Sequence, residues 1–178
     1  LRAAHELAAA GIAIRRLRMA TARDAFQRAI EAARQARIPA LIEEVQADAA
    51  VLEQPAARLI ANGAERALLP DGVEALLATD SLVVDACRDV LRCGETKLSL
   101  APRPILFSLL RTLAEAFPHD ASRETLLLRA FRARHVDESH RARLRVEMGR
   151  LRAELVSLAD ITATRDGFLL APRGGQPV

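Results

Sequence analysis

The spacing of apolar residues changes near Ser81, and one regular pattern does not describe both sides of that point. Before it, apolar residues recur three and four positions apart, as on one face of a helix. After it come the short, partly β-branched segments LVVDAC, DVLRC and TKLSL, which are typical of a small antiparallel sheet. We therefore expect a mainly α chain with small β-sheets, divided into a helical part (1–80) and a second part (81–172).

Four helices are predicted within the first 66 residues, two of them opened by prolines, which the first turn of a helix tolerates. They run from Leu1 to Arg16, from Ala20 to Arg37, from Pro39 and from Pro55. The segment NGAERALLPDG (62–72) has the composition of a connection, and a short apolar helix from Val73 to Ala78 follows it. We interpret residues 1–80 as a helical module for dimerisation or signal coupling.

Ala22, Phe26 and Ala29 recur at helical spacing, and with the preceding helix they faintly resemble one tetratricopeptide-type helical pair. Such repeats need several stacked copies to bury their faces, and no second copy is visible in the sequence. The favoured interpretation is therefore an ordinary helical hairpin that packs on the next domain, or on its own copy in a dimer.

Three predicted helices and a hairpin complete the second part. The segment APRPILFSLLRTLAEAF forms an amphipathic helix, the next helix begins at the N-cap candidate Ser122, and the third begins at Asp137. ITATRDGFLLAP is expected to form two short strands joined at Arg165, Asp166 and Gly167. Residues 173–178 are expected to be a disordered tail. The apolar face of the first of these helices consists of Ile105, Leu106, Leu109, Leu110 and Leu113.

The third helix, residues 138–158, has two faces of different composition. Its apolar stripe consists of Leu144, Met148, Leu151, Leu155 and Leu158. The opposite face holds Ser139, Ala142, Arg143, Val146, Gly149 and Arg150, with Arg145 and Arg152 on one flank and Glu147 and Glu154 on the other. A face of low bulk with arginines suits a DNA major groove, where arginine pairs with guanine and an apolar group meets a thymine methyl. Packing of this face against a protein partner is the alternative.

Four segments of residues 81–172 follow one another in a recognisable order: LVVDACRDVLRCGETKLSLAPRPILFSLLRTLAE, SRETLLLRAF, and above all VEMGRLRAEL followed by TATRDGFLL. With this order of strands, helices and hairpin, they resemble the winged helix-turn-helix domain of OmpR/PhoB-type transcription regulators. The resemblance implies a recognition helix in which Arg150 and Arg152 contact DNA and Val146 lies on the groove face. It also implies a wing in which Arg165 reaches the adjacent groove or a phosphate, with Gly167 and Phe168 as its glycine and anchoring aromatic.

Further DNA contacts are expected around this helix. Arg143 lies one turn earlier on the same face and is expected at a base edge or a phosphate. The residues expected to position the domain on phosphates are Arg103, Arg123 and Arg141. Ser139, Arg145 and His140 complete the predicted interface, and for His140, as for His135, simple exposure to solvent is the competing interpretation.

Two acidic residues depart from the pattern of this family, Glu147 in the third helix and Asp166 at the tip of the wing. We expect Glu147 to pair with Arg143 or to accept a hydrogen bond from a cytosine amino group. Residues 1–80 also depart, because they lack the alternating strands and helices of the receiver domain that commonly precedes this domain in the family. Phosphorelay control by this segment is therefore not supported.

Composition restricts the class of protein. The net charge is +3, and residues 101–178 hold 13 arginines against 9 acidic residues, which suits phosphate contact but equally a solvated surface. Cys87 and Cys93 are too few for a disulfide framework and are expected to be reduced thiols in a buried hairpin. No catalytic, metal or cofactor motif is recognised among the scattered histidines, so an enzyme is not expected. No apolar run is long enough to cross a membrane, and we expect a cytoplasmic protein.

These patterns predict a transcription regulator that binds double-stranded DNA as a homodimer through its N-terminal helices, with RNA polymerase or another regulator as a further partner. The chief alternative is a protein-interaction adaptor whose winged helix no longer binds DNA, which Glu147 and Asp166 favour. A structural subunit of a larger multidomain chain is a third hypothesis. The start at Leu1 rather than methionine leaves open a longer protein with a sensor upstream.

Overall fold

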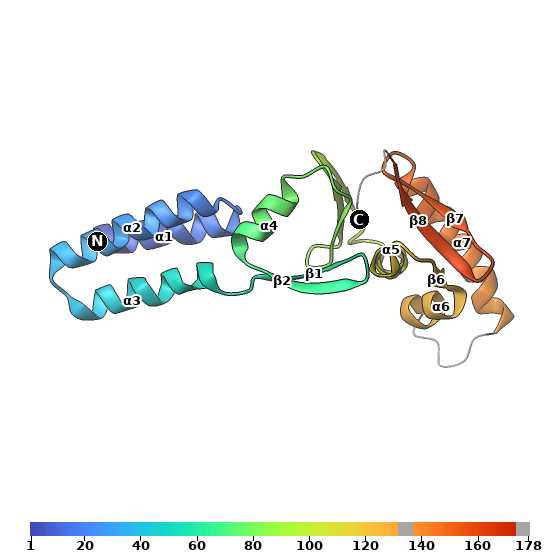
Figure 1. The fold of residues 1–178 in the computed structure, drawn as a ribbon, viewed down its shortest axis with the longest axis horizontal. Coiled ribbons are helices and arrows are strands. Elements are labelled where there is room, and N and C mark those ends of the chain that lie inside the picture. The colour runs from blue at the N-terminus through green and yellow to red at the C-terminus, as the bar shows by residue number, and fades with distance from the viewer. Residues whose placement is uncertain (132–136, 174–178) are drawn as a thin grey trace. The chain divides into compact units, whose positions relative to one another are not determined.

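A computed structural model describes residues 1–131 and 137–173 of the chain (Figure 1). The described part is mostly helical and contains three small sheets, which confirms the predicted fold class at this level. It divides into two compact units, one of residues 1–59 and 66–76 and the other of residues 60–65 and the described residues from Leu77 onward. No described helix combines the length and the apolar character needed to cross a membrane.

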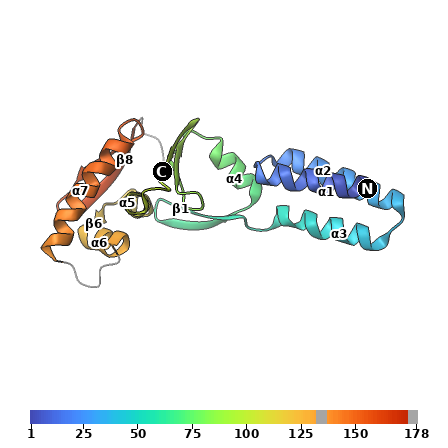
Figure 2. The ribbon, with the colours of Figure 1, turned by 180° about the vertical axis from the view of Figure 1, so that it is seen from behind.

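The first unit begins with three helices and a short 3-10 helix. Figures 1 and 2 both show α1 and α2 side by side, and α3 packs on α2. Alanines dominate their core, since Ala10, Ala22 and Ala29 are fully buried beside Met19 and Phe26. Such small side chains let helix axes approach closely. The elements are α1 (Arg2–Arg15), α2 (Met19–Ala36), α3 (Pro39–Ala49) and η1 (Ala50–Glu53), so the first three predicted helices are confirmed.

A fourth helix, α4 (Pro70–Leu77), supplies the N-terminal cap that α2 lacks. The residue at the N-cap of α2, Arg18, makes no side-chain cap hydrogen bond. Instead the Met19 N–H donates to Glu74 Oε2 of α4 at 3.0 Å, and Arg23 of α2 forms an ion pair with Asp71. These contacts satisfy a free N–H of the helix and fix α4 against the start of α2.

The prediction of a helix that opens at Pro55 is wrong, because this segment forms a β-hairpin. Its strands are β1 (Ala57–Ala61) and β2 (Ala64–Leu68), and Asn62 and Gly63 join them. Both turn residues have left-handed backbones, with φ of 51° and 73°. A two-residue turn with two positive φ angles matches the twist of a hairpin and is favoured by Asn-Gly. Residues 1–80 are therefore not wholly helical.

The second unit contains the predicted three-stranded antiparallel sheet, in the order β3-β4-β5. Its strands are β3 (Val83–Asp85), β4 (Val90–Cys93) and β5 (Thr96–Ser99). Cys87 lies exposed in the turn before β4, so the expectation of a buried thiol is wrong for this residue. Cys93 is partly buried, and both cysteines are free thiols.

Three helices share the core of the second unit, and the predicted apolar faces of the first and third are buried, with Ile105 only partly so. They are α5 (Pro104–Ala116), α6 (Arg123–Phe131) and α7 (Glu138–Leu155). Ser122 caps α6, since its Oγ accepts from the Thr125 N–H at 3.1 Å. The buried stripe of α7 continues past its end and comprises Leu144, Met148, Leu151, Leu155 and Leu158, each at most 6% exposed.

The terminal hairpin, β7 (Ala159–Ala163) and β8 (Gly167–Pro172), belongs to a sheet with a third strand that was not predicted. This strand, β6 (Ala121–Ser122), pairs with β8 and gives the order β6-β8-β7. Arg173, expected in the tail, is ordered and pairs with Asp160 at 2.8 Å. The rest of that tail and His135 lie outside the described residues.

Gly167 occupies the point where β8 meets β6. A Cβ built on Gly167 would lie 1.8 Å from the Ala121 carbonyl oxygen and 2.6 Å from its carbon. Both atoms belong to the backbone, which cannot swing aside as a flexible side chain can. The close approach of two strands, rather than a left-handed φ, therefore requires glycine here.

We predict opposite effects for alanine at two glycines of the second unit. Gly167→Ala forces β6 away from β8 and should lower the free energy of unfolding by about 1–3 kcal/mol or more. Gly149→Ala lies on α7, where nothing is within 4 Å of the added Cβ, and should raise it by about 0.5–1 kcal/mol. Urea unfolding followed by circular dichroism measures both. Equal stability of the two variants would contradict the inference that glycine is required at position 167 and replaceable at position 149.

Candidate nucleic-acid interface

The start of α7 is fixed by Asp137, as the sequence predicts. Its Oδ1 accepts from the His140 N–H at 2.9 Å and from Ser139 Oγ at 2.7 Å. The hydrogen bonds from Ser139 and His140 hold the pKa of the Asp137 carboxyl well below its usual range. His140 Nδ1 also lies 2.6 Å from Asp137 Oδ1. The polar groups of Ser139 and His140, two predicted DNA contacts, are thus engaged in the helix cap.

The outer face of α7 has little bulk. Ala142, Val146, Gly149 and Ala153 succeed one another at helical spacing and are all exposed, with Val146 at 54%. A Cβ added at Gly149 would meet open space. Because the opposite side of the helix is buried, this face is held outward and is open to close approach by another surface.

Two arginines on the first turns of α7 share one carboxylate. Arg141 Nη1 lies 3.3 Å from Glu138 Oε2, and Arg145 Nη2 lies 3.1 Å from Glu138 Oε1. The three side chains are 62–72% exposed. Ion pairs in such contact with water contribute about 0–1 kcal/mol, so a phosphate can replace the carboxylate at little cost.

Glu147 does not pair with Arg143, and that expectation is wrong. Its Oε1 accepts from Arg150 Nη1 at 2.9 Å, while the Arg143 guanidinium carbon lies 4.9 Å from the centre of the Phe131 ring. Glu147 is only 8% exposed and is not on the open outer face, where a cytosine amino group would meet it. Glu147 is buried because it lies on the side of α7 that faces α5.

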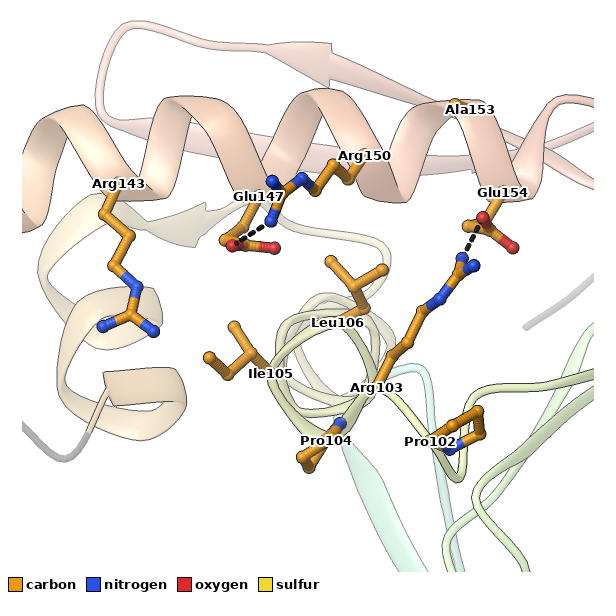
Figure 3. Close-up of a pocket in the computed structure, with 10 residues that line it drawn as sticks. All are labelled: Pro102, Arg103, Pro104, Ile105, Leu106, Arg143, Glu147, Arg150, Ala153 and Glu154. Atoms are coloured by element: carbon orange, nitrogen blue, oxygen red, sulfur yellow. Dashed lines mark hydrogen bonds and ion pairs between the residues drawn. The ribbon is translucent and has the colours of Figure 1, made fainter.

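Figure 3 shows Glu147 and Arg150 on this side of α7, with Arg150 lying along the helix to meet Glu147, and Arg143 extending away from α7 one turn earlier. They line a hollow of about 640 Å³ together with residues 102–106. At its other edge Arg103, expected to touch a phosphate, forms an ion pair with Glu154 and so joins the start of α5 to the end of α7. Arg150 keeps a side chain that is 65% exposed despite its buried partner.

The arginines next to the terminal hairpin are held by backbone carbonyls. Arg152 Nε donates to the Ile161 carbonyl at 2.8 Å. Arg123 Nη1 and Nη2 donate to the Arg165 and Thr164 carbonyls at 2.7 and 3.0 Å. Arg165 itself is exposed at the tip, and its side chain has no partner within residues 1–131 and 137–173. Asp166 is exposed beside it.

No cluster of histidine, cysteine, aspartate or glutamate suited to a metal ion occurs in the part of the chain that the structure describes. Comparison of the chain with known protein families, with curated proteins and with solved structures gives no match.

The structure adds one residue to the site that sequence reasoning did not place there, Phe131, which lies under Arg143. It also gives Arg103, expected at a phosphate, an ion pair with Glu154 of α7. The burial of Glu147 could have been predicted from the sequence, because at about 100° per residue it lies roughly 60° from the centre of the apolar stripe. The sequence could not show which arginine pairs with Glu147, since Arg143 and Arg150 are both within one turn of it.

The Asp137 cap predicts a dependence on pH. Because its pKa in the folded protein is below the value of about 3.9 expected in the unfolded chain, the carboxylate contributes full stability above about pH 4. That contribution is lost as the pH falls through the folded pKa. Asp137→Asn should therefore be less stable than wild type at pH 7, and the difference should shrink on acidification. An NMR titration that gives Asp137 an ordinary pKa would contradict this prediction.

Proposed function

We propose that the chain is a transcription regulator that binds double-stranded DNA in a sequence-specific manner, and that its second unit is a winged helix-turn-helix domain of OmpR/PhoB type. The proposal is supported by the succession of a three-stranded sheet, α5, α6, α7 and a hairpin. The observation that carries it is the exposed, low-bulk outer face of α7, bordered along its length by arginines. Such a regulator acts in the cytoplasm, with RNA polymerase or another regulator as a further partner.

The chemistry of this face matches a major groove. Ala142 and Gly149 leave room for base edges, and Val146 offers an apolar contact for a thymine methyl. Arg143 and Arg150 border the face on one side and Arg145 on the other, so each can reach a base edge or a phosphate.

Arg150 is the best candidate for base recognition because Glu147 orients it. The ion pair uses Nη1, and the guanidinium has further N–H donors for a guanine edge. Breaking the pair would leave a buried carboxylate without a partner, which costs more than the loss of an exposed pair. Arg150 should therefore keep Glu147 while it contacts DNA, whereas Arg145 can exchange Glu138 for a phosphate.

The hairpin supplies a second point of contact. Arg165 is an exposed cation at its tip, and an arginine so placed can enter a minor groove or meet a phosphate. Two contacts on one compact unit, from α7 and from the tip, would fix both position and orientation on the duplex.

A protein-interaction adaptor is the second candidate, and one observation favours it. Each acidic residue of α7 already pairs with an arginine: Glu138 with Arg141 and Arg145, Glu147 with Arg150, and Glu154 with Arg103. These pairs lower the positive potential that attracts DNA. The small, exposed face of α7 would then receive a helix of a partner.

We also infer homodimerisation through the first unit. The face of α1 opposite its buried residues carries Ala4, Ala8 and Ile12, all exposed, and Ile12 is 48% exposed. Small residues beside an exposed isoleucine leave room for a second helix to pack on this face. A dimer formed here would present two DNA-binding units to paired half-sites.

Charge reversal at Arg150 tests the DNA proposal. Wild type should bind fluorescent genomic duplex fragments, and the logarithm of its binding constant should fall linearly with the logarithm of the salt concentration. Arg150→Glu should weaken binding at least about tenfold and reduce the slope by about one or more. Fluorescence anisotropy at several salt concentrations measures both.

Two variants control this experiment. Arg34→Glu makes the same change in net charge at an exposed position of α2 and should bind as wild type does. Arg150→Gln keeps a hydrogen-bond donor for Glu147, so it separates loss of charge from loss of fold. If wild type does not bind even at low salt, the DNA proposal is wrong and the adaptor becomes the working hypothesis.

Sedimentation velocity tests the dimer. Ile12→Glu places a charge in the proposed interface and should shift the chain toward a monomer, with a dissociation constant raised at least about tenfold. Ile38→Glu is the matched control, because Ile38 is similarly exposed, at 50%, but lies at the start of α3. Identical behaviour of the two variants would count against an interface on α1.

A further inference from the structure

One residue of α6, Arg123, makes three hydrogen bonds to the tip of the terminal hairpin. Carbonyls of three successive turn residues, 164, 165 and 166, all accept hydrogen bonds from Arg123. The first two bind its guanidinium, at 3.0 and 2.7 Å, and the Asp166 carbonyl binds its backbone N–H at 3.1 Å. The fork of one arginine thus satisfies a turn whose carbonyls would otherwise depend on water.

A residue of α7 holds the same hairpin nearer its base. Arg152 Nε donates to the Ile161 carbonyl of β7 at 2.8 Å. The guanidinium carbons of Arg123 and Arg152 also lie over the Phe168 ring, 5.4 and 5.6 Å from its centre. Phe168 is 7% exposed and pairs with β6 and β7 on its two sides. Cations over a buried aromatic ring are attracted to it, so the ring joins both arginines to the sheet.

The turn itself has little freedom within these contacts. Gly167 N–H donates to Thr164 Oγ1 at 2.9 Å, Thr164 N–H donates to the Gly167 carbonyl at 3.0 Å, and the Thr164 hydroxyl also contacts Asp120. Arg165 lies inside this closed turn. Its backbone carbonyl is bound by Arg123, and the residue is exposed.

From this geometry we propose that Arg123 and Arg152 are positioning residues for the hairpin. They fix the place of Arg165 relative to α7, and so the spacing between the two DNA contacts, instead of contacting DNA themselves. The inference rests on the proposed function and revises the role that the family resemblance implies for Arg152. Both terminal nitrogens of Arg123 already bind carbonyls, so its fork is not available to a phosphate. Arg152 keeps its terminal N–H groups, but its Nε–H is bound to Ile161 and its guanidinium lies over Phe168, and these contacts fix it to the hairpin.

A double-mutant cycle on DNA binding tests the proposal. The probe is a fluorescent mixed-sequence duplex about three helical turns long, titrated at several salt concentrations. Arg165→Ala should weaken binding and lower the salt slope by about one. Arg152→Ala should weaken binding to a similar degree, yet add little in a chain that already carries Arg165→Ala. Arg123→Ala should behave in the same way.

Two further variants separate positioning from direct contact. Arg152→Lys keeps the positive charge but not the Nε–H that reaches Ile161, so it should remain as weak as Arg152→Ala. A phosphate contact would instead be largely restored by lysine. Arg145→Ala is the matched control, because its loss should add in full to that of Arg165→Ala. Additive losses for Arg152→Ala, or rescue by lysine, would overturn the proposal.

Hydrogen exchange tests the clamp without DNA. The amides of Thr164 and Gly167 should exchange at least about tenfold faster in Arg123→Ala than in wild type, while the amides in the middle of α7 keep their protection. Unchanged exchange at the turn would show that Arg123 does not hold it and would also overturn the proposal. If the turn is held but wild type binds no duplex at any salt concentration, the proposed function fails and the inference about Arg165 fails with it.

Discussion

The burial of one side of α7 is the constraint on which the second unit depends. Leu144, Met148 and Leu151 are at most 3% exposed, and burying such side chains contributes about 1.5–3 kcal/mol each. A helix is stiff, so fixing one side fixes the direction of all the others. Packing of the buried side therefore fixes the direction of the outer face, and the fold does not depend on the side chains of that face.

Arginines of similar appearance in the sequence have different environments in the fold. Arg145 pairs with the exposed carboxylate of Glu138, and Arg150 pairs with the buried carboxylate of Glu147. Arg152 donates to a carbonyl of the neighbouring strand β7. The difference follows from which acceptor each guanidinium meets first. Net charge alone would count these residues as equal, whereas an arginine paired only with an exposed carboxylate, such as Arg145, can respond to salt or to a polyanion with little change in structure.

Elements with local causes could be predicted from the sequence. The helices, the apolar stripe of α7, the cap at Asp137 and the terminal hairpin follow from periodicity, capping residues and turn residues within a few positions. Strand β6 escaped because its partner Gly167 is distant in sequence and the strand is only two residues long. The hairpin at Asn62 and Gly63 had a clear signal, but a proline at position 55 was given more weight. In the site, outward-facing positions were predictable and the partners of the charged groups were not.

The cap that Glu74 provides for α2 has a consequence for the order in which the chain can fold. Met19 and Glu74 are 55 residues apart, yet their hydrogen bond completes the first turn of α2. The pairing of α1 with α2 involves near neighbours and can form as soon as both have left the ribosome. The start of α2 must then remain frayed until residue 74 has been synthesised and α4 has docked. Within the first unit, the hydrogen bond between Met19 and Glu74 is therefore expected to form last.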